Sequence, residues 1–263
     1  MNQTFSLKRI GRLLRKQLTD YQIHYLLGMG VLLGGLVLLM GGTVYLERQH
    51  FSARVQASFF SVLLLAAGAY FTSTVFAAVG DKQQAASLLL LPASRLEKYL
   101  VGWGLSLLAF TAVYTATFYV ADILTIQFVR LQGYPASLFN VFSAAEPSSA
   151  WLLKCYPLLH GFMLYGSVFF RKNQFVRTAA LGLLGLLILA IVNWQVLHVL
   201  LGASISLALP FGSATVHGAP AAFDMMREVS VPAHQLPWLG ALPVVLAVML
   251  WVAAYFRFAE TQV

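Results

Sequence analysis

Charge and cysteine are what this sequence has least of. Only 10% of its 263 residues are Asp, Glu, Lys or Arg, 59% are hydrophobic, and the mean hydropathy is +0.76. Soluble domains carry about 25% charged residues. The single cysteine, Cys155, excludes an internal disulfide and a cysteine-based metal cluster. No Gly-Lys pair occurs, so the chain lacks a G-x-x-x-x-G-K-[ST] phosphate-binding loop. These absences indicate an integral membrane protein without its own nucleotide site.

Long stretches without charge define the candidate membrane spans, because a helix needs about 20 apolar residues to cross the hydrocarbon. We predict one all-α, polytopic transmembrane domain over 1–263. Its six spans lie at about 23–45, 59–79, 99–121, 151–170, 179–201 and 238–256. Residues 202–223 are also uncharged, but Pro210, Gly212 and Pro220 interrupt them. We expect a re-entrant or interfacial segment over 202–237 on the extracytoplasmic side, with a seventh span over 202–223 as the alternative.

The basic residues predict the orientation. With a cytoplasmic N-terminus, 12 of the 17 Lys and Arg residues fall in cytoplasmic segments. These are Lys8, Arg9, Arg12, Arg15, Lys16, Lys82, Arg95, Lys98, Arg171, Lys172, Arg177 and Arg257. The positive-inside rule then favours both ends in the cytoplasm of a multi-pass protein of the cell's inner (plasma) membrane. The net charge of +8 is explained by these flanks, so we expect no nucleic-acid partner.

Residues 5–21 predict an amphipathic helix before the first span. Its apolar residues follow the i, i+3/i+4 spacing: Leu7, Ile10, Leu14, Leu18 and Tyr21. Its basic residues fall within an arc of about 120°; they are Lys8, Arg9, Arg12, Arg15 and Lys16. Such a helix lies at the membrane surface and turns its basic face toward lipid phosphates or a partner protein.

The segment between the second and third spans predicts a short cytoplasmic helix over 81–91. Asp81 can serve as its N-cap, and Pro92 ends it. Ser94 and Glu97 then have capping-box spacing, so a new helix starts at Ser94 and continues into the third span. The exposed run Leu88–Leu91 predicts a protein contact, unless it sinks into the lipid interface or packs on neighbouring spans.

Four segments of the chain together resemble the membrane-spanning permease subunits of type-2 ABC transporters. They are the basic amphipathic helix, LLLLPASRLEKYL after the second span, GSVFFRKNQFVRT at the end of the fourth, and the terminal YFRFAETQV. The resemblance implies an exporter built from two permease copies or paralogues, each docked on a cytoplasmic ATPase that binds ATP and Mg²⁺. It also implies that 81–91 is the coupling helix, 5–21 a connecting helix, and 202–237 a pair of re-entrant helices. The implied ATPase-coupling residues are Lys82, Gln83, Gln84, Leu88, Leu89, Leu90, Leu91, Ser94 and Glu97.

Candidate transport positions are the polar and aromatic residues within the spans. They are Tyr70, Thr72 and Ser73 of the second span and Asn193, Trp194 and Gln195 of the fifth. The alternative role is hydrogen bonding between helices, worth about 0.6 kcal/mol each on average. Gly30 and Gly34 permit close helix approach, either within a protomer or between protomers.

Other functional classes have weaker support in the sequence. His24, His160 and His198 stand alone, so we expect no metal ligands and no catalytic residues, and we interpret His160 as a hydrogen-bonded packing residue. Asp122, at the outer end of the third span, is expected at the interface. The serines of the spans have no recognisable partner base; these are Ser61, Ser73, Ser106 and Ser167. A secondary transporter or channel, or a non-transporting anchor or assembly factor, remains the alternative.

Overall fold

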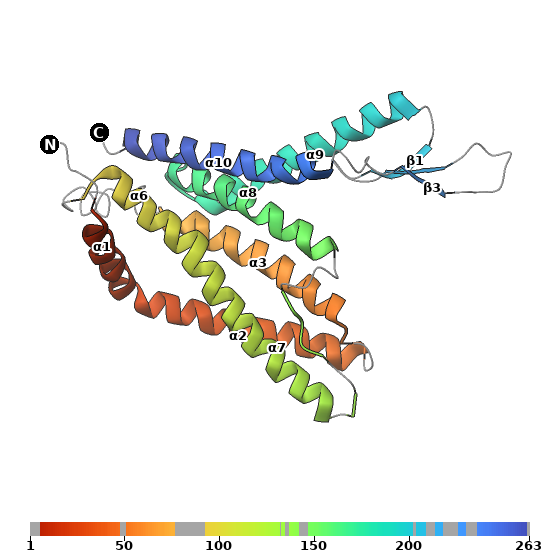
Figure 1. Cartoon of the computed structure of the whole chain (residues 1–263), viewed down its shortest axis with the longest axis horizontal. Helices are drawn as coiled ribbons and strands as arrows, with labels where there is room; N and C mark the ends of the chain where they lie inside the picture. Colours follow the sequence, from red (N-terminus) through yellow and green to blue (C-terminus); the bar gives the residue numbers. More distant parts are fainter. Residues whose placement is uncertain are drawn as a thin grey trace.

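The computed structural model describes residues 6–47, 51–76, 93–131, 133–134, 137–141, 147–201, 204–208, 214–217, 226–229 and 236–261. Helices cover all six predicted spans (Figure 1). They are α2 (Gln22–Glu47), α3 (Ala53–Val75), α6 (Arg95–Gly104) continued by a π-helical turn (Leu105–Ala109) and α7 (Phe110–Leu131), α8 (Pro147–Phe169), α9 (Gln174–Leu201) and α10 (Leu236–Thr261). Over the described residues, five of these are long and apolar enough to cross a membrane. The chain is a helical, multi-pass membrane protein.

The third apolar helix is much longer than its predicted span of 99–121. It is continuous over Arg95–Leu131, which is 37 residues. At 1.5 Å per residue it is about 55 Å long, whereas the hydrocarbon core of a bilayer is about 30 Å thick. The second helix lies earlier in the chain than expected, at Ala53–Val75 instead of 59–79. The helix ends therefore follow caps and turns rather than the limits of the uncharged stretches.

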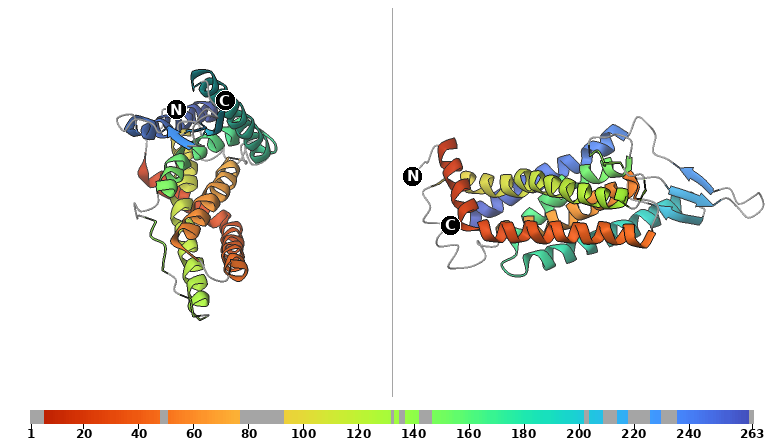
Figure 2. Two further views of the ribbon diagram at one scale, coloured as in Figure 1. Left: turned by 90° about the vertical axis from the view of Figure 1, so that its right-hand side faces the viewer. Right: turned by 90° about the horizontal axis from the view of Figure 1, so that it is seen from below.

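The long helices alternate in direction, so that the bundle has two distinct ends (Figures 1 and 2). The first, here named the α1 end, holds α1 (Leu7–Asp20), the starts of α6 and α9, and the last turn of α10. The opposite end, the sheet end, holds the end of α7 and the strands between α9 and α10. α8 lies in the middle and contacts α3, α9 and α10, whereas α2 packs on α7.

Two aromatic clusters fill the interior, one toward each end. Toward the sheet end, Phe60 of α3 meets the edge of Phe118 of α7 with their centroids 5.0 Å apart. Toward the α1 end, Phe76 stacks on Tyr99 at 5.9 Å and also contacts Phe258 at 5.0 Å. These large buried rings fix the spacing of the helices, because they supply most of the contact area in the interior.

The segment between α9 and α10 corrects the all-α prediction. Its described residues form a three-stranded antiparallel sheet of β1 (Ser204–Ala208), β2 (Ala214–His217) and β3 (Met226–Val229). They are neither the re-entrant helices implied by the resemblance nor a seventh span. The alternation Ser-Ile-Ser-Leu in β1 is typical of a strand, and Pro210 and Gly212 follow where a helix would have to continue.

The amphipathic helix is present over Leu7–Asp20, close to the predicted 5–21. Tyr21 ends it, and α2 starts at Gln22 in a different direction, so α1 lies across the end of the bundle rather than along it (Figure 2). α1 contacts α6, the helix that starts at Arg95. α1 thus places the N-terminal region against the start of the third apolar helix.

Candidate functional site

The carboxylate of Glu97 joins α1 to the start of α6. Its Oε1 accepts hydrogen bonds from the backbone N–H of Ser6 at 2.7 Å and from Nη2 and Nε of Arg9 at 3.0 and 3.3 Å. Its Oε2 accepts from the backbone N–H of Ser94 at 2.9 Å, and Ser94 Oγ accepts from Glu97 N–H at 3.2 Å. The predicted capping box is therefore confirmed, and its glutamate also binds a second helix.

This carboxylate is buried and fully satisfied. The side chain of Glu97 is 0% exposed, and that of Arg9 is 31% exposed. A buried charge is costly unless its partners replace the lost water; here both oxygens accept hydrogen bonds, and one accepts from a guanidinium. The sequence predicted the local bond to Ser94 but not the contacts with Ser6 and Arg9, which lie 91 and 88 residues away. Contacts between residues so far apart in the chain leave no short-range pattern in the sequence.

α1 presents three different faces. Arg9, Ile10 and Leu13 are half-buried toward the bundle. The four other predicted basic residues are exposed on the outer side: Lys8, Arg12, Arg15 and Lys16. Leu7 and Leu18 are also exposed, at 75% and 43%, on a strip beside the cations. An exposed apolar strip next to an exposed basic strip fits a helix at a lipid surface.

Further cations gather at the α1 end on the turn between α8 and α9. Arg171 and Lys172 are exposed there, and Asn173 has φ +51°, the left-handed conformation that reverses the chain. Arg177 lies 5.9 Å from the ring centroid of Phe170. Nearby on α10, Arg257 lies 5.3 Å from the ring centroid of Phe169 and pairs with Glu260 at 2.8 Å. The α1 end is therefore a cationic surface.

The predicted coupling helix at 81–91 lies outside the described residues. This holds for Lys82, Gln83, Gln84, Leu88, Leu89, Leu90 and Leu91. Its flanks are described: Phe76 packs on Tyr99 and Phe258, and Ser94 caps α6, both at the α1 end. The described chain on either side of this segment thus contacts α6: Phe76 packs on Tyr99, and Ser94 binds Glu97.

The predicted transport positions fall into two separate groups. Thr72 and Ser73 are buried near the end of α3, toward the α1 end, and Tyr70 is exposed beside the ring of Phe175. Asn193, Trp194 and Gln195 lie toward the sheet end of α9, where the Trp194 ring stacks on that of His198 at 5.4 Å. The structure does not bring the two groups together within one protomer, and their role in transport stays a prediction.

A buried polar cluster joins α6, α8 and α10 in the middle of the bundle. Trp251 Nε1 donates to His160 Nδ1 at 3.0 Å, and His160 Nε2 lies 2.9 Å from Ser106 Oγ. The indole is only a donor, so Nδ1 accepts and the ring proton is on Nε2. Ser106 Oγ therefore accepts from His160 and donates to the carbonyl of Gly102 at 2.9 Å. The imidazole does not activate this hydroxyl, and His160 is a hydrogen-bonded packing residue.

Ser106 also lies in the π-helical turn Leu105–Ala109. A single π turn widens a helix locally and is common at functional positions. The sequence contained no signal for it, because Ser106 gains its partner from a helix 54 residues further on. About two turns earlier, Tyr99 Oη donates to the carbonyl of Trp251 at 2.7 Å, so α6 is also joined directly to α10.

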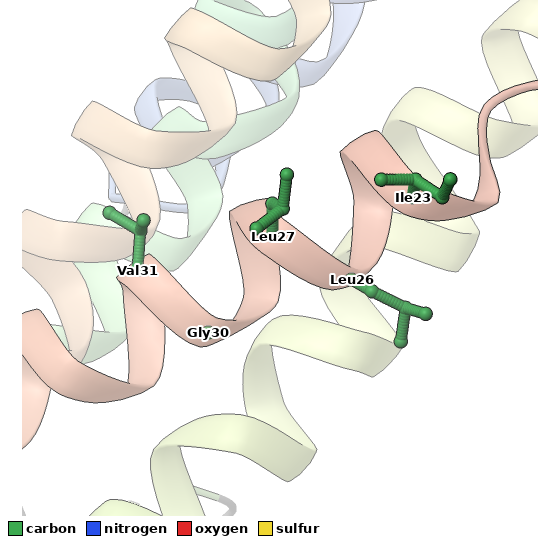
Figure 3. A pocket seen from close by; sticks show the side chains of 5 residues that line it. All are labelled: Ile23, Leu26, Leu27, Gly30 and Val31. Atoms are coloured by element: carbon green, nitrogen blue, oxygen red, sulfur yellow. The ribbon is translucent and has the colours of Figure 1, made fainter.

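The glycines of α2 face open space. A Cβ placed on Gly30, Gly34 or Gly35 would meet nothing within 4 Å among the neighbouring helices. A shallow apolar hollow lies on this helix, lined by Ile23, Leu26, Leu27, Gly30 and Val31 (Figure 3). Only 11% of the apolar window of α2 is buried. Of the two roles expected for Gly30 and Gly34, close packing within the protomer is therefore wrong for the residues described.

Glu97→Gln should release α1 from α6. The amide keeps the size of the side chain but removes the charge that Arg9 and the backbone of Ser6 bind, at a cost of about 1.5–3 kcal/mol. Amide hydrogen exchange in α1, measured in lipid nanodiscs, should accelerate about tenfold to a hundredfold. Glu260→Gln, which removes an exposed carboxylate, is the control and should leave it unchanged. Unchanged exchange in Glu97→Gln would show that the carboxylate does not hold α1.

His160→Leu should destabilise the bundle. It removes the acceptor of the Trp251 indole and the donor to Ser106, which costs about 1–3 kcal/mol for buried groups. Thermal unfolding of the purified protein in detergent measures the loss. His198→Leu makes the same change at an exposed position and should have little effect. Equal stability of the two variants would contradict a structural role for the cluster.

Comparisons with known proteins found no relative of this chain. No protein-family model matches the chain, and neither a curated protein nor a solved structure matches it significantly.

Proposed function

We propose that the chain is the membrane-spanning permease subunit of an ATP-driven exporter of the type-2 ABC class. In this proposal it binds no nucleotide, and a separate cytoplasmic ATPase holds ATP and Mg²⁺. The chain lies in the cell's inner (plasma) membrane, with six spans and with the α1 end in the cytoplasm. The cations exposed at that end, on α1 and on the turn after α8, agree with the positive-inside rule.

The Glu97 junction is the observation that carries the proposal. A subunit that receives motion from a cytoplasmic partner needs a rigid connection between its surface elements and a span. Glu97 supplies it, because one carboxylate caps the helix of the third span and holds the amphipathic helix. The proposed coupling segment at 81–91 directly precedes this junction in the chain. Motion of 81–91 would thus act on α1 and on the third span together.

The basic face of α1 supports a second contact, with the membrane itself. Lys8, Arg12, Arg15 and Lys16 are exposed beside the exposed Leu7 and Leu18. In this proposal the leucines enter the lipid, and the cations bind the phosphates of anionic headgroups, each worth about 1 kcal/mol near a charged surface. α1 then anchors the junction at the level of the cytoplasmic headgroups.

The open glycine face of α2 supports association with a second copy or a paralogue. Glycines allow two helices to approach closely, and a Cβ on those of α2 would meet nothing within 4 Å among the described residues. The transport path would run along the axis between the two permeases, so Tyr70 and Asn193 need not share a cavity in one protomer. An apolar, weakly polar path suits an apolar or amphiphilic cargo.

The double substitution Leu89→Asp/Leu90→Asp should abolish association with the ATPase. Charged side chains in the proposed coupling segment cannot enter an apolar notch without an uncompensated desolvation cost. Affinity purification in mild detergent, with identification of co-purifying chains, should recover an ATPase with a phosphate-binding loop from the wild type only. Val199→Asp/Leu200→Asp, a matched pair at the sheet end with 79% and 73% exposure, is the control. A wild-type preparation without such an ATPase contradicts the proposal.

Gly34→Leu should weaken the dimer without unfolding the protomer. The new side chain meets open space inside the protomer but blocks close approach of a second helix. Mass measurement of the detergent-solubilised protein should show a shift from dimer to monomer at unchanged thermal stability. Gly185→Leu, at an equally open glycine on α9, should leave the dimer intact. The opposite result, with only Gly185→Leu dissociating it, would place the interface on α9.

A further inference from the structure

Asp122 was expected at the interface, yet it is fully buried near the sheet end. Its side chain is 0% exposed in the middle of α7, and neither carboxylate oxygen has a hydrogen-bond partner among the residues that the structure describes. The backbone N–H of Phe139, in the segment that follows α7, faces this carboxylate, although it forms no hydrogen bond of ordinary geometry with it. Glu97, the other fully buried carboxylate, has all its partners. The two carboxylates therefore differ in what balances their charge.

Gln56 of α3 leaves a third unsatisfied oxygen close to Asp122. Its Nε2 donates to the carbonyl of Ser137 at 3.0 Å and to that of Phe51 at 3.4 Å. This fixes Oε1 as an acceptor, and Oε1 has no donor among the described residues, although Gln56 is 0% exposed. Ser137, which binds Gln56, is two residues from Phe139, which lies beside Asp122.

The packing of the helices places these side chains in one layer. Phe60 of α3 and Phe118 of α7 touch with their centroids 5.0 Å apart, and the ring of Phe139 covers both, at 5.9 and 6.3 Å. Gln56 precedes Phe60 by one turn, and Asp122 follows Phe118 by one turn. Because α3 and α7 run in opposite directions, both steps lead toward the sheet end. Residues 137–141 pack over this layer, through Ser137 on Gln56 and Phe139 on the two rings.

We propose that Asp122 and Gln56 bind a monovalent alkali cation at this position. Carboxylate and amide oxygens are the ligands of hard cations, and a single positive charge balances the one carboxylate. A proton on Asp122 is the competing way to balance this carboxylate, through an O–H···O bond to Gln56 Oε1, and the experiment below distinguishes the proton from the cation. A divalent ion would leave a surplus charge in a buried site.

The position of the site along the helix allows exchange with the aqueous phase. Asp122 is about 40 Å from Arg95 along the helix axis at 1.5 Å per residue. This exceeds the hydrocarbon thickness of about 30 Å. With Arg95 at one surface, Asp122 lies at the level of the opposite headgroups. The non-helical segment 137–141 packs against the site there, and unwound segments also line the ion sites of transporters. The proposed cation site does not depend on the proposal that the chain binds a partner ATPase.

Thermal unfolding of the purified full chain in detergent tests the cation. At constant pH and ionic strength, replacing choline chloride by 150 mM NaCl should raise the midpoint by about 2 °C or more, because the ion binds only the folded state. The rise should saturate with concentration. Gln56→Leu should shift the half-saturating NaCl concentration upward at least tenfold, and Asp122→Asn should remove the response. Glu260→Gln, which removes an exposed carboxylate, should keep the full response.

Three results overturn the proposal. The first is an equal midpoint in NaCl, KCl and choline chloride. The second is stabilisation by acid alone, with Asp122→Asn as stable as the acidified wild type, which assigns a proton to the carboxylate. The third is stabilisation by CaCl₂ where NaCl has no effect. If Asp122→Asn does not fold, the wild-type titration and Gln56→Leu still decide, because Gln56→Leu keeps the carboxylate while it removes the amide, including the Nε2 that binds Ser137 and Phe51.

Discussion

The carboxylate of Glu97 is the interaction on which the α1 end depends. It accepts hydrogen bonds from a backbone amide on each side of the junction and from one guanidinium, all within 3.3 Å. Without it, the N-terminus of α6 would lose the reciprocal half of its capping box, and the only described ion pair between α1 and the bundle would be gone. An ion pair of this kind fixes geometry more than it adds stability, because desolvation offsets much of the attraction. Its consequence is that the orientation of α1 is fixed relative to the third apolar helix by one side chain.

The same third helix is irregular near its middle, where it contacts α8. At Ser106 the α-helical pattern is interrupted by a π turn, and the imidazole of His160 occupies the position beside it. The hydrogen bonds of His160 and Trp251 tie this turn to α8 and α10, which are the elements at the centre of the fold. The helices with the least burial, α2 and α9, lie at the periphery instead. The polar contacts are thus concentrated where the third helix crosses the central pair.

Local signals in the sequence predicted the helices and one cap correctly, whereas long-range contacts stayed invisible. The spacing of Ser94 and Glu97 is enough to predict a capping box, since both partners lie within one turn. The partners of Glu97 on α1, and those of His160 on two other helices, come from distant segments and have no periodic signature. The sheet between α9 and α10 was missed for a different reason. Its lack of charge favoured a membrane segment, and the alternation in β1 was outweighed by the prolines and glycines around it.

Asp122 shows that hydropathy alone does not predict whether a charged residue at the end of a span is exposed to water. The end of an uncharged stretch predicts an interfacial carboxylate, because water is expected where the apolar run stops. Here α7 continues for more than two turns beyond Asp122, and residues 137–141 return over the groove between α3 and α7, so water is replaced by Phe139. The continuous helix Arg95–Leu131 consequently carries one buried carboxylate near each end and a π turn between them. α1 contacts the first carboxylate directly, whereas two routes lead from α1 to the second: along the third helix past the segment that His160 holds, and through α2, which follows α1 and packs on α7. The middle segment is therefore one of two physical connections between the ends of the protein.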